Sequence, residues 1–159
     1  MLAISAGNLL ATCRRAELEN VRADYIVPVP MHRSRQKDRG VNSPDVLSEA
    51  LGQRLNIPTV RHLVRRIRPT DLQYTLSSHA RVENVSGAFT LCPVNLWGKL
   101  GFRQIRQSIV GKSVLLVDDI LTTGSTCNEV TKVLLTAGVR SVTVTVLARA
   151  EGKYSPSIR

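Results

Sequence analysis

The sequence has few aromatic residues and no long apolar run. Aromatic residues make up 4% of the 159 positions, so the stacking platforms that bind single-stranded nucleic acid are not evident. No apolar run approaches the roughly 20 residues of a membrane-spanning helix. The N-terminus also lacks the charged segment and apolar core of a signal peptide. These absences predict a cytoplasmic protein with no membrane span.

Cysteine is also scarce. The three cysteines, Cys13, Cys92 and Cys127, are far apart in the sequence, and no Cys-x-x-Cys pair occurs. This spacing argues against a zinc site and favours reduced thiols. Cys127 falls in the first turn of a predicted helix, where a thiolate would be stabilised. A small buried side chain is the simpler interpretation of that position.

Acidic residues are outnumbered by basic ones. The chain has 12 acidic residues against 22 lysines and arginines, which gives a net charge of +10. Such a balance suits a polyphosphate ligand or nucleic acid, and it equally suits an arginine-rich surface that binds neither. The length and the apolar share of 43% fit one folded domain with its own core.

Residues 112–137 carry the strongest pattern in the chain. The apolar run Val114–Val117 is short and has β-branched ends, which is typical of a strand buried on both faces. Over Cys127–Ala137 the apolar residues recur at helical spacing instead. Gly138 would end that helix, and alternating valines over Val142–Val146 indicate another strand. The stretch therefore predicts a right-handed βαβ unit.

The loop between strand and helix consists of small hydroxyl residues around a glycine. Gly124 allows a sharp turn and a close approach of the backbone to a ligand. Thr126 and Glu129 match the S/T-x-x-E capping box, which predicts that the helix starts at Thr126. Backbone N–H groups, hydroxyls and the positive end of the helix would then converge, as they do in a phosphate site. The residues of this predicted site are Thr122, Thr123, Gly124, Ser125 and Thr126.

Two carboxylates, Asp118 and Asp119, separate the strand from this loop. They follow the carboxyl end of the strand, where open α/β sheets bind their ligands. Carboxylates repel a phosphate, but they accept hydrogen bonds from sugar hydroxyls or attract Mg²⁺. The combination predicts a sugar phosphate as the ligand. For the loop taken alone, a strand, a polar loop and an ordinary capped helix remain an alternative.

The other segments alternate between helical and extended patterns. Helices are predicted over Met1–Val21, from Ser43 to a point before Pro58, and from Ser77 or Ser78 to Val85. Strands are predicted over 24–29, 59–67 and 87–91, and residues 92–111 are interpreted as a flexible insertion. This alternation predicts an α/β fold in which a mostly parallel sheet carries helices on both faces.

The string from Val114 to Thr126 resembles the motif with which type I phosphoribosyltransferases bind phosphoribosyl pyrophosphate (PRPP). Further blocks narrow the resemblance to the ComF family of late-competence-like proteins. These blocks are Val27–His32, Arg39–Asn42, the spaced residues Gln73, Leu76, Arg81 and Asn84, and Gly87–Phe89. The resemblance implies a type I phosphoribosyltransferase-like domain, which in this family is associated with DNA uptake.

The resemblance also implies a role for each matching residue. Asp118 and Asp119 would bind the ribose hydroxyls of PRPP as the catalytic pair, and residues 122–126 would hold its 5-phosphate. On the pyrophosphate side would lie Pro30, Met31 and His32, with Mg²⁺ held mainly through the oxygens of PRPP itself. A mobile loop over the site would be flanked by Arg65, Arg68 and Gln73.

The chain departs from the family pattern at several points. It lacks the cysteine-rich, metal-binding finger and the short basic segment that usually precede the domain. Residues 1–159 are therefore interpreted as a single domain with its core at 22–150. Val41 stands where an aromatic residue is usual, and Ser43 stands where glutamine is usual. These departures are consistent with a fragment or a mis-started reading frame, and nothing marks a hood for an acceptor base.

Two functions from different classes follow from this pattern. The first is an Mg²⁺-dependent transferase that moves ribose 5-phosphate from PRPP to an unidentified acceptor and releases pyrophosphate. The second is a protein that binds PRPP without turnover, as a sensor or a component of DNA uptake. The expected partners are PRPP, nucleic acid bound without sequence preference, and a second copy of the chain or a component of the competence machinery.

Overall fold

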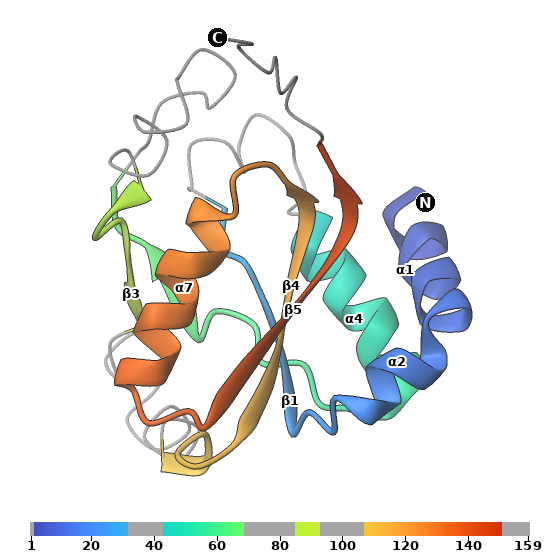
Figure 1. Ribbon diagram of the computed structural model, residues 1–159, viewed down its shortest axis with the longest axis horizontal. Coiled ribbons are helices and arrows are strands. Elements are labelled where there is room, and N and C mark those ends of the chain that lie inside the picture. The colour runs from blue at the N-terminus through green and yellow to red at the C-terminus, as the bar shows by residue number, and fades with distance from the viewer. Residues whose placement is uncertain (1, 32–42, 69–84, 93–106, 151–159) are drawn as a thin grey trace, which may run out of the picture.

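Three parallel strands form the main sheet of the protein. The computed structural model describes residues 2–31, 43–68, 85–92 and 107–150 (Figure 1). Strands β1 (Tyr25–Pro28), β4 (Ser113–Leu121) and β5 (Ser141–Arg149) lie in the order β1-β4-β5, so β4 is the central strand. Both neighbouring pairs are parallel, which confirms the predicted mostly parallel sheet.

Helices cover both faces of this sheet. On one face α1 (Leu2–Cys13) packs against α4 (Ser43–Leu55), and α4 contacts β1 and β4. The short helix α2 (Arg15–Asn20) follows α1. On the other face lies α7 (Ser125–Thr136), which connects β4 to β5 (Figure 1). The fold class predicted from the sequence is therefore confirmed.

A second sheet of two strands packs against α7. Its antiparallel strands are β2 (Val64–Arg66) and β3 (Phe89–Leu91). The guanidinium of Arg66 lies 5.3 Å from the centre of the Phe89 ring, which is a cation–π distance. Because α7 contacts β2 and β3 as well as β4 and β5, this one helix joins the two sheets.

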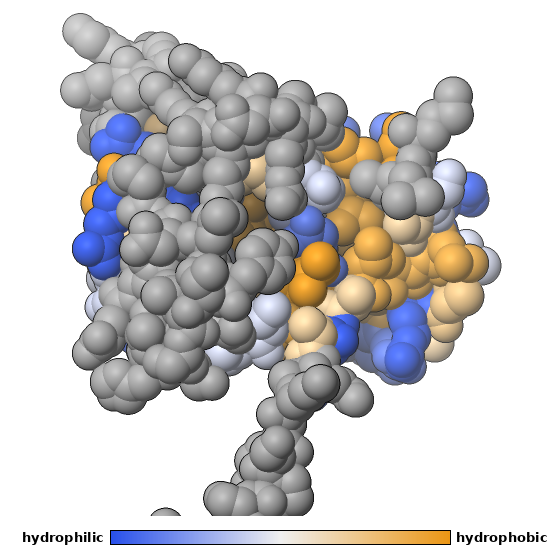
Figure 2. Space-filling view, turned by 90° about the horizontal axis from the view of Figure 1, so that it is seen from above, coloured by the Kyte–Doolittle hydropathy of each residue, from blue (hydrophilic) through white to orange (hydrophobic). Residues whose placement is uncertain are grey.

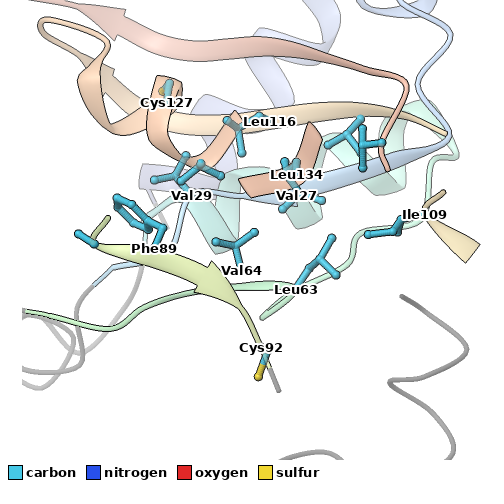
Figure 3. Packing of buried hydrophobic residues seen from close by; sticks show 14 of the residues in the cluster. Val27, Val29, Leu63, Val64, Phe89, Cys92, Ile109, Leu116, Cys127 and Leu134 are labelled. Atoms are coloured by element: carbon cyan, nitrogen blue, oxygen red, sulfur yellow. The ribbon is translucent and has the colours of Figure 1, made fainter. Parts of the chain in front are cut away.

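The alternation of side chains along β4 divides the core into two clusters. Val114 and Leu116 pack on the side of α7, where they share a cluster with Leu134 of that helix (Figure 3). Leu115 and Val117 pack on the opposite side, in a cluster that includes residues of α4. Successive side chains of a strand point to opposite faces. Four consecutive apolar residues therefore bury both sides of the central strand.

Some large apolar side chains stay exposed on α1 and β5. They are Ile4, Leu9, Val144 and Leu147. Figure 2, seen from above, shows apolar surface on the side of the molecule where α1 lies. In the part of the chain that the structure describes, no helix combines the length and the apolar character that crossing a bilayer requires.

Two predicted elements differ from the structure. The helix predicted over Met1–Val21 is broken near its middle, because Arg14 leaves helical geometry with φ −116° and ψ 20° between α1 and α2. The strand predicted over 59–67 is reduced to β2, because His62 adopts a positive φ of 60° and turns the chain. Thr59 forms an isolated bridge with Ile26 instead of a continuous strand.

The segment interpreted as an insertion, residues 92–111, joins the core at both ends. Cys92 is buried, and Ile109 is 0% exposed in the cluster that contains Leu134. The N–H of Gly111 donates to the carbonyl oxygen of Gly138 at 2.7 Å, which ties the start of β4 to the end of α7. The interpretation as a flexible insertion is wrong for these ends, and residues 93–106 lie outside the described residues.

Candidate functional site

The carboxyl ends of β1 and β4 lie side by side at one edge of the sheet. Pro28 of β1 is opposite Val117 of β4 in the parallel register. The ladder continues one step further, since the N–H of Val29 donates to the carbonyl oxygen of Val117 at 2.9 Å. Pro30 and Met31 therefore leave β1 beside the point where Asp118 follows the apolar run of β4. Segments that are far apart in the sequence meet here.

The central strand extends further than the sequence predicted. Instead of ending before the carboxylates, β4 continues through them to Leu121, because Asp118 and Ile120 stay in the ladder with β5. Asp118 and Asp119 are consecutive in a strand, so their side chains leave opposite faces of the sheet. Asp118 is on the face of α7, where it contacts Cys127. The two aspartates are thus inequivalent.

Both carboxylate oxygens of Asp118 have a hydrogen-bond donor. Oδ1 accepts from the backbone N–H of Asp119 at 2.9 Å, and Oδ2 accepts from the Sγ of Cys127 at 3.6 Å. Burial, and next the negative charge of Asp119, raise the pKa of Asp118 to about 7. Asp118 therefore changes charge close to neutral pH. For Asp119, Oδ1 accepts from the N–H of Ile120 at 2.8 Å.

Gly124 starts the helix that follows the loop. It has a positive φ of 77°, and α7 runs from the next residue, Ser125. The predicted capping box at Thr126 is wrong, because the N-cap is Gly124 and no side chain caps the helix there. Glu129 accepts the backbone N–H of Gly87 at 3.1 Å through Oε2 and the ammonium of Lys132 at 2.5 Å through Oε1. The helix begins at the glycine because that residue tolerates the left-handed conformation.

The hydroxyls of the loop are gathered at the N-terminus of α7. Thr123 Oγ1 and Ser125 Oγ are 2.9 Å apart, and the N–H of Ser125 points to Thr123 Oγ1 at 3.4 Å. The N–H of Asn128 already bonds to the carbonyl oxygen of Gly124 at 2.9 Å, so the first turn is fully formed. The positive end of a helix and small hydroxyls at one point suit an anion.

A strand, a loop of small hydroxyl residues and a helix thus meet at the carboxyl edge of a parallel sheet. Residues 46–158 of the chain match the model of the phosphoribosyl transferase domain. The chain belongs to this family. Its segment 113–136, with β4, the loop and α7, lies inside the matched range and contains both aspartates.

The curated relatives of this phosphoribosyltransferase-family chain include a competence protein and a DNA utilization protein. It is 38% identical over 127 residues to Competence protein F of Haemophilus influenzae, which covers 80% of this chain and 51% of that protein. It is 33% identical over 126 residues to the DNA utilization protein YhgH of Escherichia coli, with 79% and 49% covered. The resemblance to ComF-like proteins is confirmed, and the chain spans about half the length of these relatives.

Solved structures show the same fold at low sequence identity. The glutamine PRPP amidotransferase of B. subtilis superposes with a TM-score of 0.54 and 19% identity, covering 91% of this chain and 26% of the enzyme. A protein of Neisseria gonorrhoeae with bound ppGpp gives a TM-score of 0.55 and 16% identity, covering 99% and 72%. These structural similarities support the phosphoribosyltransferase fold. At this level of identity they show the fold alone.

Of the two arginines predicted to flank a loop, Arg65 lies on the small sheet and Arg68 lies two residues after its strand β2. Arg65 is exposed on β2, and the guanidinium of Arg68 donates to the carbonyl oxygen of Ser86. The segment 69–84, which contains Gln73, lies outside the described residues. His32, predicted on the pyrophosphate side, also lies outside them. The structure brings Pro30, Met31, the aspartates and residues 122–126 to one edge of the main sheet.

Sequence reasoning missed two contacts of α7. One is the contact of Cys127 with Asp118, and the other is the bond between Glu129 and the backbone of Gly87. The first joins residues nine positions apart across a turn, and the second joins segments 42 positions apart. Neither separation corresponds to a helix or strand period, so periodicity could not reveal them.

Proposed function

We propose that this edge of the sheet binds PRPP and that the chain is a phosphoribosyltransferase. In this proposal residues 122–126 hold the 5-phosphate, and Asp118 and Asp119 accept hydrogen bonds from the ribose hydroxyls. Pro30 and Met31, with His32 of the following segment, lie on the pyrophosphate side. The observation that carries the proposal is the position of Gly124: its positive φ begins α7 beside the two aspartates at the carboxyl edge.

The reaction would break the bond between ribose C1 and the pyrophosphate oxygen, and form a bond from C1 to a nucleophilic acceptor. Pyrophosphate leaves with the bonding electron pair, and the acceptor loses a proton. The residues of this chain contribute by orienting the ribose and by stabilising charge as it develops. No covalent intermediate with the protein is needed, so no side chain is assigned as a nucleophile.

Magnesium fits this site as part of the ligand. In the described part of the chain, no group of three or more acidic, histidine or cysteine side chains forms a metal site. Mg²⁺ prefers oxygen ligands and commonly binds through phosphates of the substrate. The ion would therefore arrive with PRPP and be held mainly by its oxygens, and when bound it supplies charge neutralisation of the pyrophosphate.

The alternative is a protein that keeps the PRPP site without turnover. The names of the relatives, Competence protein F and DNA utilization protein YhgH, favour a role in DNA uptake or use. A net charge of +10 is compatible with contact to nucleic acid in that role. In this alternative PRPP would act as a signal that changes the affinity for another partner.

Pyrophosphate release separates the two functions. The protein would be incubated with PRPP, Mg²⁺ and a panel of nucleobases and amines, and pyrophosphate would be measured by a coupled assay. Release that depends on one acceptor supports the transferase. PRPP binding by calorimetry without release from any acceptor supports the binding protein. If PRPP does not bind at all, both functions are refuted.

We expect Asp118→Asn combined with Asp119→Asn to weaken PRPP binding by roughly a hundredfold or more, because each of the two lost charged hydrogen bonds costs about 1.5–3 kcal/mol. The fold should persist, since both side chains lie at the edge of the sheet. Binding would be measured by calorimetry and folding by a melting curve. A matched control neutralises two exposed carboxylates of α2, Glu17→Gln with Glu19→Gln. Equal PRPP affinity of both double variants would contradict the assignment.

A further inference from the structure

The Cys127 thiol lies against the proposed ribose-binding carboxylate. Cys127 is 3% exposed in the first turn of α7 and belongs to the core cluster between that helix and β4 (Figure 3). Its Sγ is 3.6 Å from Oδ2 of Asp118. Because the cysteine is fixed by packing on one side, its polar atom has a fixed direction relative to β4.

The thiol acts as a donor in this contact. Burial, and next the charge of Asp118, raise the pKa of Cys127 to about 12, so the sulfur keeps its proton at neutral pH. The stabilised thiolate considered for this helix position is therefore wrong. A protonated thiol beside a carboxylate donates a weak hydrogen bond, and the carboxylate accepts it.

The two donors at Asp118 hold its carboxylate at both oxygens. The backbone N–H of Asp119 binds Oδ1, and the thiol of Cys127 binds Oδ2. Each carboxylate oxygen has two acceptor positions, so each one keeps a position for a ligand hydroxyl. An alanine at position 127 would leave Oδ2 facing an apolar helix turn, and the carboxylate would gain freedom to rotate.

We propose that Cys127 is a positioning residue, whose buried thiol holds the Asp118 carboxylate in the orientation that accepts the ribose hydroxyls. This inference rests on the proposed binding of PRPP at the same edge. It assigns to Cys127 a role beyond filling space in the core. The thiol does not touch the ligand; it acts through Asp118.

The test compares four proteins by calorimetry with ribose 5-phosphate and with inorganic phosphate. They are the parent, Cys127→Ala, Cys127→Ser and Val130→Ala. Cys127→Ala should weaken ribose 5-phosphate binding about fivefold, the size of one lost hydrogen bond, and leave inorganic phosphate binding unchanged. Cys127→Ser supplies a hydroxyl donor in the same place and should restore most of the affinity.

Val130→Ala is the matched control for packing. Val130 is 0% exposed in the same cluster, less than one turn further along α7. Its truncation should lower the melting temperature and leave both ligand affinities as in the parent. If Cys127→Ala behaves like Val130→Ala, or if serine does not restore binding, Cys127 is a packing residue and the proposal is overturned.

A double-mutant cycle with Asp118→Asn separates this proposal from the proposed function. In that background Cys127→Ala should cause no further loss of ribose 5-phosphate affinity. The same cycle on the free energy of unfolding, without ligand, measures the contact itself. Additive effects in the unfolding cycle overturn the positioning role whatever the ligand does. If the parent fails to bind ribose 5-phosphate, the proposed function is refuted. Coupling in the unfolding cycle would still establish the contact between Cys127 and Asp118.

Discussion

Gly124 is the residue on which the proposed phosphate loop, residues 122–126, depends, because its φ of 77° lies in the left-handed region. We expect Gly124→Val to abolish binding of ribose 5-phosphate and PRPP. A β-branched residue is strained in that conformation by about 1–3 kcal/mol, so the loop would shift and its N–H groups would no longer converge. A Cβ at this position meets Leu121 at an ordinary 3.7 Å, so the expected loss comes from backbone strain rather than from a clash.

Gly111→Val is the matched control for that strain. Gly111 has a φ of 72°, and a Cβ there would meet nothing within 4 Å. It precedes β4 at the opposite edge of the sheet. Calorimetry and melting curves should show that both variants lose stability and that Gly124→Val alone loses ligand binding. Retained binding of ribose 5-phosphate by Gly124→Val would refute the phosphate loop.

Asp118 should give the protein a pH-dependent stability. Its pKa is raised from 3.8 to about 7 by burial and then by Asp119, so the folded state holds this proton more tightly than the unfolded chain. The corresponding stabilisation is complete below the unfolded pKa and is lost as the pH rises through about 7. We expect stability to fall between about pH 4 and 8 by on the order of 4 kcal/mol from this group.

Melting temperatures across this range would be compared for the parent and Asp118→Asn. The asparagine variant cannot titrate, so most of the decline should disappear. Parallel curves for the two proteins would show that Asp118 is ionised throughout. The affinity for ribose 5-phosphate should rise over the same range, because the ionised carboxylate is the better acceptor of ribose hydroxyls.

At the scale of single residues, the local sequence pattern predicted which residue makes a turn and which is buried. It did not predict which residues contact one another. The sequence correctly indicated that Gly124 makes the turn and that Cys127 is buried. It misplaced the start of α7, because Thr126 and Glu129 satisfy a capping pattern that tertiary structure overrides. Glu129 binds the backbone of Gly87 instead, a contact that depends on β3 being folded against α7.

At the scale of elements, Glu129 links α7 to the turn at Gly87 that leads into β3 of the small sheet. Glu129→Ala should lower the free energy of unfolding by about 1 kcal/mol, because the N–H of Gly87 loses its acceptor. Hydrogen exchange at the Gly87 amide should become faster in that variant. Lys132→Ala is the control: it removes the ion pair at Glu129 but keeps the bond to Gly87, and a surface pair contributes about 0–1 kcal/mol. Unchanged exchange in Glu129→Ala would contradict this role.

Elements with strong periodicity were predicted well. The run Val114–Val117 and the following helix were found because the apolar period changes within a few residues. The arginine-rich segment 59–67 was misread as one strand, since the left-handed turn at His62 has no signal in residue type. Pairing of β1 with β4 could not be derived from either strand alone, because it depends on the whole chain between them.

At the scale of the whole molecule, the net charge of +10 makes weak DNA binding the expected default. Such binding should be independent of sequence and strongly salt-dependent, because it would rest on phosphate contacts. Fluorescence anisotropy with two unrelated duplexes, at about 50 and 200 mM salt, would measure it. Tight binding to one duplex that persists at the higher salt would rule out a purely electrostatic interaction.

The adjacency of β1 and β4 has a consequence for how the protein folds. Tyr25 pairs with Val114, which is 114 − 25 = 89 positions later, so the loop closed by this pairing covers more than half of the chain. Closing so long a loop costs entropy before the contacts can compensate, which makes folding slow. A nascent chain cannot complete the proposed phosphate loop beside β1 until position 126 has left the ribosome. A sugar phosphate binds only after this loop has formed. It should therefore lower the unfolding rate of the native state and leave the folding rate unchanged.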